Sequence, residues 1–335
     1  MSDEIKISIL MPAKNASQFI NACIDSVIAQ NFKAWELLVV DDFSDDKTFE
    51  ILSQYSFSDK RIKVFKNNSV GIIPALSLAF QHSKGNYITR MDADDIMPTN
   101  KLDLFLTEIR RSSLKTVITG KVNYFSNESV SNGYTRYQNW LNNLGSLKNR
   151  YAQIYRECIV ASPNWIAHRS CFENEINIED LIYPEDYDMV FKWYKTGYQI
   201  KQINETTHLW REHENRTSRT NIDYQQKAFF TLKTNYFIDI ELQVDEKIQL
   251  IGAGIKGKLV AKILNERNVK FDWFDFNSQQ ESIDGILNFI QPISYITKNH
   301  KSILTVWPES EITQQEITDY LTGIGLEFGK NVWLF

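Results

Sequence analysis

Three carboxylates directly follow a short apolar run. Residues 87–91 (YITRM) have the composition of a β-strand, and Asp92, Asp94 and Asp95 come next, with the small residue Ala93 between the first two. Like charges this close raise one another's pKa unless a cation neutralises them. Oxygen ligands of this kind suit Mg²⁺ or Mn²⁺, which keep coordination positions free for water and phosphate oxygens. An acidic turn that caps a helix is the competing interpretation.

A second carboxylate pair, Glu185 and Asp186, opens a segment in which Met189, Val190 and Trp193 recur at helical spacing. One such carboxylate could take the proton of an attacking hydroxyl group. Acidic side chains also favour helix N-termini for electrostatic reasons alone. The pair by itself therefore leaves a catalytic and a purely structural interpretation open.

Composition limits the classes of protein to which this chain can belong. It has 335 residues, of which 43% are hydrophobic and 24% charged, as in globular proteins with a substantial core. This length predicts two domains. The formal net charge of −5 argues against a nucleic-acid partner, which usually needs a basic face, and is compatible with an anionic substrate bound through a metal.

Cysteine usage and hydropathy bear on the compartment. Cys23, Cys158 and Cys171 show no metal-ligand spacing and indicate reduced thiols in a cytoplasmic protein. Neither a leader with a basic then an apolar part nor a run of about eighteen apolar residues is visible, so we expect no signal peptide and no spanning helix. Peripheral association with the inner face of a membrane stays open.

Strands and helices alternate through the first hundred residues. The expected strands are 5–11, 36–40, 61–65 and 87–91, and helices are expected to open near Ser17, Ser44 and Gly71. Such alternation predicts a parallel sheet, in which ligands bind beyond the carboxyl ends of the strands. Three polar clusters stand at these ends and together favour a nucleotide site: Pro12-Ala13-Lys14-Asn15, Asp41-Asp42 and Asp92-Ala93-Asp94.

Several spaced segments, in this order, resemble glycosyltransferase family 2. They are SILMPAKN at 8–15, LVVDDFSD at 38–45, Gly71 with Ala75, Ala79 and Gly85, and MDADD at 91–95 with Pro98. The resemblance covers about residues 4–220. It implies an α/β fold of the GT-A nucleotide-diphospho-sugar transferase type. It also implies transfer of a sugar from a nucleoside diphosphate to an acceptor hydroxyl, with inversion of the anomeric configuration.

The resemblance assigns roles to individual residues. Nucleotide-sugar binding falls to Pro12, Ala13, Asn15, Asp42, Gly71, Ala75, Asp92, Ala93 and Asp94. In the family, the position of Asp42 hydrogen-bonds the base, typically a uracil imide. The position of Asp92 contacts ribose or sugar, and that of Asp94 binds the divalent ion, Mn²⁺ or Mg²⁺, that bridges the diphosphate.

The acceptor half carries the remaining family signals. Asp186 matches the family's catalytic base, and we expect Glu185 to bind the acceptor. His213, in a segment that follows the last strand of the family fold, is a candidate metal ligand or phosphate contact. Arg211 and Arg216 are further candidate phosphate contacts. We also expect a helix over 138–156 and favour a core position for Trp165 over stacking on a sugar.

The last ninety or so residues contain a second chemical pattern. An expected strand at 247–251 is followed by Gly252, Gly254 and Gly257, a helix, and a strand at 270–276 that carries Asp275. This is the context of a dinucleotide fingerprint. The unit is short for a full dinucleotide domain, and no residue set for hydride transfer follows it. It resembles small Rossmann-like modules of bacterial sugar-transferring enzymes. A structural or oligomerisation role is favoured over NAD, while a nucleotide ligand stays open.

These observations give one main hypothesis and two rivals. We expect a GT-A domain over 1–220, a helical linker over 221–246 and a small Rossmann-like domain over 247–335. The main hypothesis is an inverting, metal-dependent glycosyltransferase that uses a nucleotide-sugar donor, expected to be a UDP-sugar, and a glycan or lipid-linked acceptor in bacterial surface polysaccharide synthesis. The rivals are an NAD-dependent oxidoreductase and a non-catalytic nucleotide-sugar-binding protein. Homo-oligomerisation is left open.

Overall fold

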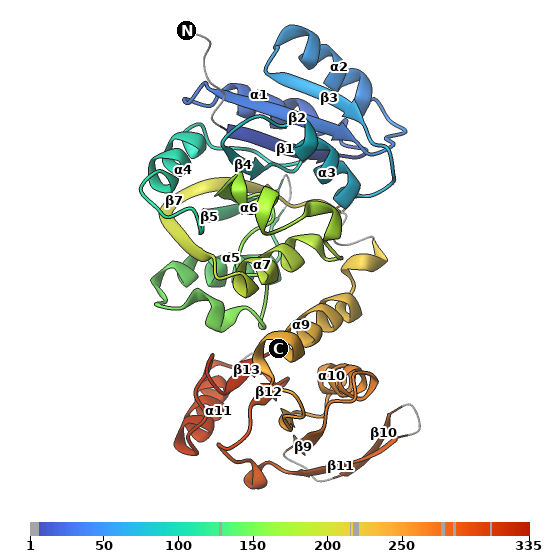
Figure 1. Ribbon diagram of the computed structural model, residues 1–335, viewed down its shortest axis with the longest axis vertical. Helices are drawn as coiled ribbons and strands as arrows, with labels where there is room; N and C mark the ends of the chain where they lie inside the picture. Colours follow the sequence, from blue (N-terminus) through green and yellow to red (C-terminus); the bar gives the residue numbers. More distant parts are fainter. Residues whose placement is uncertain are drawn as a thin grey trace. The chain divides into compact units, whose positions relative to one another are not determined.

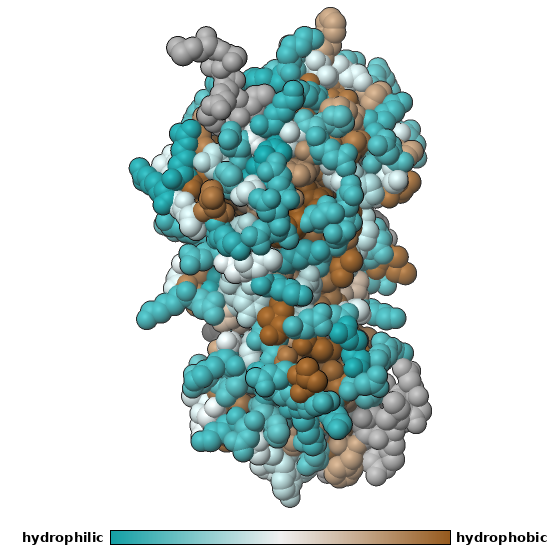
Figure 2. Space-filling view, in the orientation of Figure 1, coloured by the Kyte–Doolittle hydropathy of each residue, from teal (hydrophilic) through white to brown (hydrophobic). Residues whose placement is uncertain are grey.

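The computed structural model describes residues 7–126, 129–214, 216, 221–275, 279–283, 286–308 and 310–335 (Figure 1). The chain divides into two compact units, of which the first comprises 1–148 and 160–216 and the second 149–159 and 217–335. Residues 149–159 lie inside the expected GT-A domain but cluster with the second unit. In Figure 2, hydrophilic side chains cover most of the visible face of each unit. No helix in the described ranges has the length and hydropathy needed to cross a bilayer.

A seven-stranded sheet organises the first unit, in the order β3-β2-β1-β4-β6-β5-β7. β1 pairs in parallel with β2 and β4, and β2 with β3, whereas β6 runs antiparallel to β4 and β5. The parallel part confirms the expected α/β class. The strands are β1 (Ile7–Ala13), β2 (Trp35–Asp41), β3 (Ile62–Lys66), β4 (Tyr87–Arg90), β5 (Thr116–Phe125), β6 (Trp165–His168) and β7 (Gln199–Arg211).

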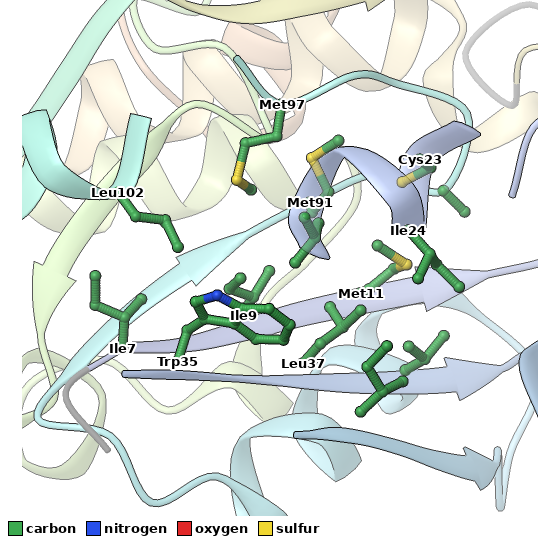
Figure 3. Close-up of a cluster of buried hydrophobic side chains, with 14 of the residues drawn as sticks. Ile7, Ile9, Met11, Cys23, Ile24, Trp35, Leu37, Met91, Met97 and Leu102 are labelled. Carbon is green, nitrogen blue, oxygen red and sulfur yellow. The ribbon is translucent and has the colours of Figure 1, made fainter. Parts of the chain in front are cut away.

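Apolar side chains on the sheet and its helices form the core of the first unit. Every residue of β2 is buried, as a strand covered on both faces requires. Figure 3 shows side chains of β1, β2 and α1 packed with Met91 and Met97 of the loop after β4. The helices are α1 (Ile20–Ile28), α2 (Thr48–Ser58), α3 (Ile72–His82), α4 (Lys101–Ile109), α5 (Asn132–Asn143), α6 (Ser170–Asn174) and α7 (Glu185–Lys195).

The helix expected over 138–156 is wrong beyond Asn143. α5 ends there, and only short 3₁₀ turns follow, at Leu144–Ser146 and Arg150–Gln153. Gly145 is a poor helix former. Tyr155 explains why the later part of the segment is not helical. Its ring is buried in the second unit and stacks on Phe335, with 5.3 Å between centroids. Aromatic packing there overrides the helical periodicity of the segment.

The second unit has a six-stranded sheet in the order β10-β11-β9-β8-β12-β13. All neighbours are parallel except β10 and β11, and later strands lie on both sides of β8, as in a Rossmann-like arrangement. The sequence did not predict β10 or β11, and Phe276, Thr217 and Ser218 lie outside the described residues. The elements are α9 (Gln226–Glu241), β8 (Ile248–Ile251), α10 (Ile255–Glu266), β9 (Phe271–Asp275), β10 (Gln279–Ile283), β11 (Ile286–Pro292), β12 (Ser302–Leu304), α11 (Glu311–Gly323) and β13 (Val332–Leu334).

Candidate active site

The acidic loop after β4 is joined to the end of β7 by Asp95. This side chain is fully buried. Its Oδ1 accepts a hydrogen bond from the backbone N–H of Arg211 at 2.8 Å, and its Oδ2 lies 2.8 Å from Nε2 of His208. Burial, followed by the charge of Asp94, raises the pKa of Asp95 well above its ordinary value. Asp95 therefore anchors β7 against the loop; the family resemblance implies that this position holds the donor sugar or the loop, but the contact with β7 was not predicted.

Asp94 and His213, the two expected metal ligands, lie in contact. Oδ2 of Asp94 is 2.9 Å from Nε2 of His213, and the imidazole packs on the ring of Phe19 with 4.5 Å between centroids. Burial opposes ionisation of Asp94, but the hydrogen bond with His213 and the charge of Arg216 outweigh it and lower its pKa. Arg211 donates from Nε to the backbone oxygen of Asp94 at 2.7 Å.

Arg90, at the end of β4, connects the two expected halves of the site. Its Nε lies 2.7 Å from Oδ1 of Asp92, and its Nη1 lies 2.8 Å from Oε1 of Glu185, the first residue of α7. Arg90 and Glu185 are 3% and 1% exposed, so this is a buried ion pair. Burial alone would lower the pKa of Arg90, but the charges of Asp92 and Glu185 raise it. Burial raises the pKa of Asp92, although Arg90 opposes that shift.

Arg90 was not predicted as a site residue, although the sequence contains a signal for it. A charged residue within an otherwise buried strand is almost never fully buried unless it is paired. Arg90 stands two positions before an acidic cluster, which supplies one partner locally. The second partner, 95 positions further along the chain, could not be identified without the fold.

Asp186 occupies the next position of α7 and remains partly accessible. Its Oδ1 accepts a hydrogen bond from the backbone N–H of Tyr187 at 2.8 Å. Burial first, and then the charge of Glu185, raise the pKa of Asp186 to about 7, while the charge of Arg90 opposes the increase. A carboxylate with a pKa close to the working pH is well suited to accept and release a proton.

Asp42, the expected contact to the nucleoside base, is buried at the end of β2. Its Oδ1 accepts hydrogen bonds from Nδ2 of Asn67 at 2.7 Å and from the backbone N–H of Gly71 at 2.9 Å. The other oxygen, Oδ2, lies 3.5 Å from Nζ of Lys14. Gly71 has a φ of 125°, which requires glycine, and a Cβ there would also displace the hydroxyl of Tyr183, 2.8 Å away.

The remaining expected nucleotide residues lie along the same edge of the sheet. Ala13 O accepts from the backbone N–H of Asp42 at 2.7 Å, which joins the ends of β1 and β2. Asn15, with a φ of 49°, ties the loop after β1 to Ser44 and Asp45 through bonds of 3.0 Å. Pro12 is half-buried, and Ala75 and Ala93 are buried. Trp165 is a core residue, 3% exposed, as favoured.

The glycine turn of the second unit forms as its pattern predicts. Gly252 has a φ of 104°, and a Cβ on Gly257 would stand 2.0 Å from the backbone oxygen of Gly252, so α10 packs closely on the turn. Gly254 has open space where a Cβ would lie. Oδ2 of Asp275 accepts a hydrogen bond from the backbone N–H of Ala253 at 2.6 Å. The backbone N–H of Ala253 in the turn is therefore already hydrogen-bonded to a carboxylate of the chain itself.

Comparison with known sequences places this chain among sugar-transferring proteins. WfgD of Escherichia coli, a UDP-Glc:alpha-D-GlcNAc-diphosphoundecaprenol beta-1,3-glucosyltransferase, is 36% identical over 130 residues, which are 38% of this chain and 50% of WfgD. Chondroitin synthase of Pasteurella multocida is 28% identical over 235 residues, 68% of this chain and 22% of that protein. The matched regions thus span half or less of these relatives.

Comparison of structures identifies the fold. Crystalline TarS 1-349 of S. aureus, in complex with UDP-GlcNAc, superposes with a TM-score of 0.54 and 19% identity, over 78% of this chain and 72% of TarS 1-349. This likeness shows a GT-A fold, as expected. The sequence model described as "Glycosyl transferase family 2" matches residues 8–175, which is half of the chain. The chain therefore belongs to glycosyltransferase family 2.

Proposed function

We propose that this protein transfers a sugar from a nucleoside-diphosphate sugar to a hydroxyl group, with inversion. The observation that carries the proposal is the pairing of Arg90 with both Asp92 and Glu185, at 2.7 and 2.8 Å. Asp92 belongs to the expected donor side and Glu185 to the expected acceptor side. One cation in contact with both supports a single site in which donor and acceptor meet.

Asp186 is the proposed catalytic base. Its partly accessible carboxylate and its pKa of about 7 support removal of the acceptor's hydroxyl proton. The acceptor oxygen forms a bond to the anomeric carbon as the bond from that carbon to the diphosphate breaks. The proton passes to Asp186 and the electron pair of the broken bond leaves with the diphosphate. Attack from the face opposite the leaving group inverts the configuration.

Asp94 and His213 are the proposed ligands of Mn²⁺ or Mg²⁺. Such ions are commonly held by one or two protein side chains together with substrate phosphates and water. A carboxylate and an imidazole 2.9 Å apart fit this requirement, and Nδ1 of His213 is buried without a hydrogen-bond partner among the described residues. No group of three His, Cys, Asp or Glu suited to a metal occurs in the described ranges. When bound, the ion neutralises charge on the leaving diphosphate.

The names of related proteins support a UDP-sugar donor. WfgD is named for UDP-Glc and for an acceptor on diphosphoundecaprenol, and TarS was crystallised with UDP-GlcNAc. By analogy, we assign a glycan or lipid-linked acceptor, in bacterial surface polysaccharide synthesis, at the cytoplasmic face of the membrane. Asp42, at the carboxyl end of β2, is the proposed contact to the uracil. Transfer belongs to the first unit in this proposal, and the second unit has a structural role.

Calorimetric titration with UDP, with and without Mn²⁺, tests this proposal. We expect UDP to bind and Mn²⁺ to strengthen binding, because the ion links the diphosphate to Asp94. Asp94→Asn should abolish the Mn²⁺ enhancement. Asp180→Asn, an exposed carboxylate at the entry to α7, should retain it and serves as the matched control. The absence of UDP binding, together with quenching or enhancement of NADH fluorescence, would instead favour an oxidoreductase.

A further inference from the structure

The start of α7 is fixed on two sides. Glu185 is held by Arg90, whereas Oδ2 of Asp188 accepts a hydrogen bond from the backbone N–H of Ile182 at 3.0 Å. Both carboxylates are buried, at 1% and 0% exposure. Asp186 lies between them and is the one of these three acids that remains partly accessible. The position of Asp186 is therefore set by its neighbours on the helix.

Arg90 makes contacts that another cation could not reproduce. Two different nitrogens of its planar guanidinium each meet a carboxylate, Asp92 within its own loop and Glu185 on α7. A lysine ammonium is a compact point charge on a flexible stem and lacks this fork geometry. Removing the guanidinium would leave the buried Glu185 and the half-buried Asp92 without their cation, which strongly disfavours the present arrangement.

We propose that Arg90 is a positioning residue that fixes Asp186 against the D-x-D loop by holding Glu185. This inference rests on the proposed function and assigns Glu185 to anchoring in place of acceptor binding. Arg90 touches neither reacting group; it acts through the first turn of α7. Arg90 thereby fixes the position of the helix that carries the proposed base relative to the loop that receives the donor.

The pKa of Asp186 reports on the ion pair of Arg90 and Glu185, because both charges act on it. The charges of Glu185, Arg90 and Asp92 act on this pKa, and the backbone N–H of Tyr187 donates a hydrogen bond to Asp186. Glu185 raises its pKa and Arg90 lowers it. Neutralising Glu185 should therefore lower the pKa of Asp186, and neutralising Arg90 should raise it. General loss of structure at α7 would instead expose Asp186 and lower its pKa in both variants.

The experiment compares Arg90→Gln, Glu185→Gln and the double variant by carboxyl ¹³C titration of aspartate-labelled protein. Asp186→Asn identifies the resonance. The midpoint should rise in Arg90→Gln, fall in Glu185→Gln and lie between them in the double variant. Lys63→Gln, which breaks the ion pair of the half-buried Lys63 on β3 with the buried Glu36 on β2, 2.7 Å apart, should leave the midpoint unchanged. Shifts of both single variants in one direction would overturn the proposal.

Arg90→Lys separates charge from position. Its ¹³C midpoint should stay close to that of the wild type, because the charge is kept. Its kcat for UDP release from UDP-glucose or UDP-N-acetylglucosamine should fall by about tenfold or more, because a single point charge cannot hold both carboxylates. Full kcat in Arg90→Lys would overturn the positioning role. A wild type that releases no UDP would contradict the proposed function, and the ¹³C titration would still test the Arg90 contacts.

Discussion

The two sheets carry different groups at the carboxyl ends of their parallel strands. In the first unit this edge carries Arg90, Asp92 and Asp94, and the start of α7 carries Asp186, whose pKa is raised to about 7 by burial and then by the charge of Glu185. In the second unit it carries a glycine turn in which the backbone N–H of Ala253 donates a hydrogen bond to Asp275. The same kind of strand edge thus carries the proposed proton-transfer site in one unit and an internally packed turn in the other.

This difference teaches that glycine spacing is a weaker functional signal than paired charge. Gly252 and Gly257 are explained by a positive φ and by close contact between α10 and the turn, without any ligand. Backbone conformation and close packing do not account for the buried ion pair of Arg90 with Glu185 in this way. Buried ion pairs contribute little net stability compared with apolar residues of similar size, which makes a functional reason more persuasive for them.

Replacing the proposed base should have the largest effect on kcat of all the substitutions. If kcat did not change, the proposed functional difference between the two sheets would be wrong. Asp186→Asn should lower kcat for sugar transfer by about 10²- to 10⁴-fold, the usual contribution of a general base, while UDP binds as in the wild type. Asp275→Asn in the second unit should leave kcat unchanged. Unaltered transfer by Asp186→Asn, measured as UDP release, would point to a different base or to a non-catalytic protein.

Tyr155 tests the assignment of residues 149–159 to the second unit. Its ring is 1% exposed and packs on Phe335 and edge-on against Phe237. Tyr155→Ala should therefore destabilise the second unit by about 3–5 kcal/mol, as for other buried aromatic truncations. Tyr295→Ala, at a tyrosine that is 65% exposed in the same unit, should stay within about 0.5 kcal/mol. Urea unfolding measures both, and equal effects would refute the packing role.

A pair of glycine substitutions sharpens the account of the second unit. A Cβ at Gly257 would stand 2.0 Å from the backbone oxygen of Gly252, so Gly257→Ala should cost about 1–3 kcal/mol or more. Gly254 has a φ of −71° and open space, so Gly254→Ala should be nearly neutral in thermal denaturation. If instead Gly254→Ala abolished binding of a nucleotide, the turn would be a ligand site after all.

The pH dependence of activity and of stability has a definite sign. Activity should rise with pH through about 7 as Asp186 loses its proton, by about tenfold per pH unit below that value. The free energy of unfolding should instead fall as the pH rises. The folded pKa of Asp186 lies above the value of about 3.9 in an unfolded chain, so the folded protein binds more protons and loses stability as pH rises from about 4 to 7. Thermal denaturation of Asp186→Asn should lack this component.

The sequence was sufficient for local features and insufficient for those that depend on distant partners. Alternating strands and helices predicted the parallel part of the first sheet, and the burial of Ile20, Cys23, Ile24 and Val27 on α1 follows their spacing. The position of Asp94 beside His213 agrees with the family order, although their role stays a prediction.

Other features required the three-dimensional context. The bridge from Arg90 to Glu185 joins residues 95 positions apart, and Asp95 meets His208 across 113 positions. No local pattern specifies such pairs. The helix expected over 138–156 failed for the same reason, because burial of Tyr155 against the C-terminal aromatic residues decided the conformation of that segment.

A crystal structure of the full chain with UDP and Mn²⁺ tests the central claim most directly. We predict density for the ion at Asp94 and His213, with the diphosphate next to it and Asp186 facing the bound donor, while Arg90 remains bound to Asp92 and Glu185. A diphosphate bound away from Asp94, or an Asp186 carboxylate that faces a separate cavity, would contradict it.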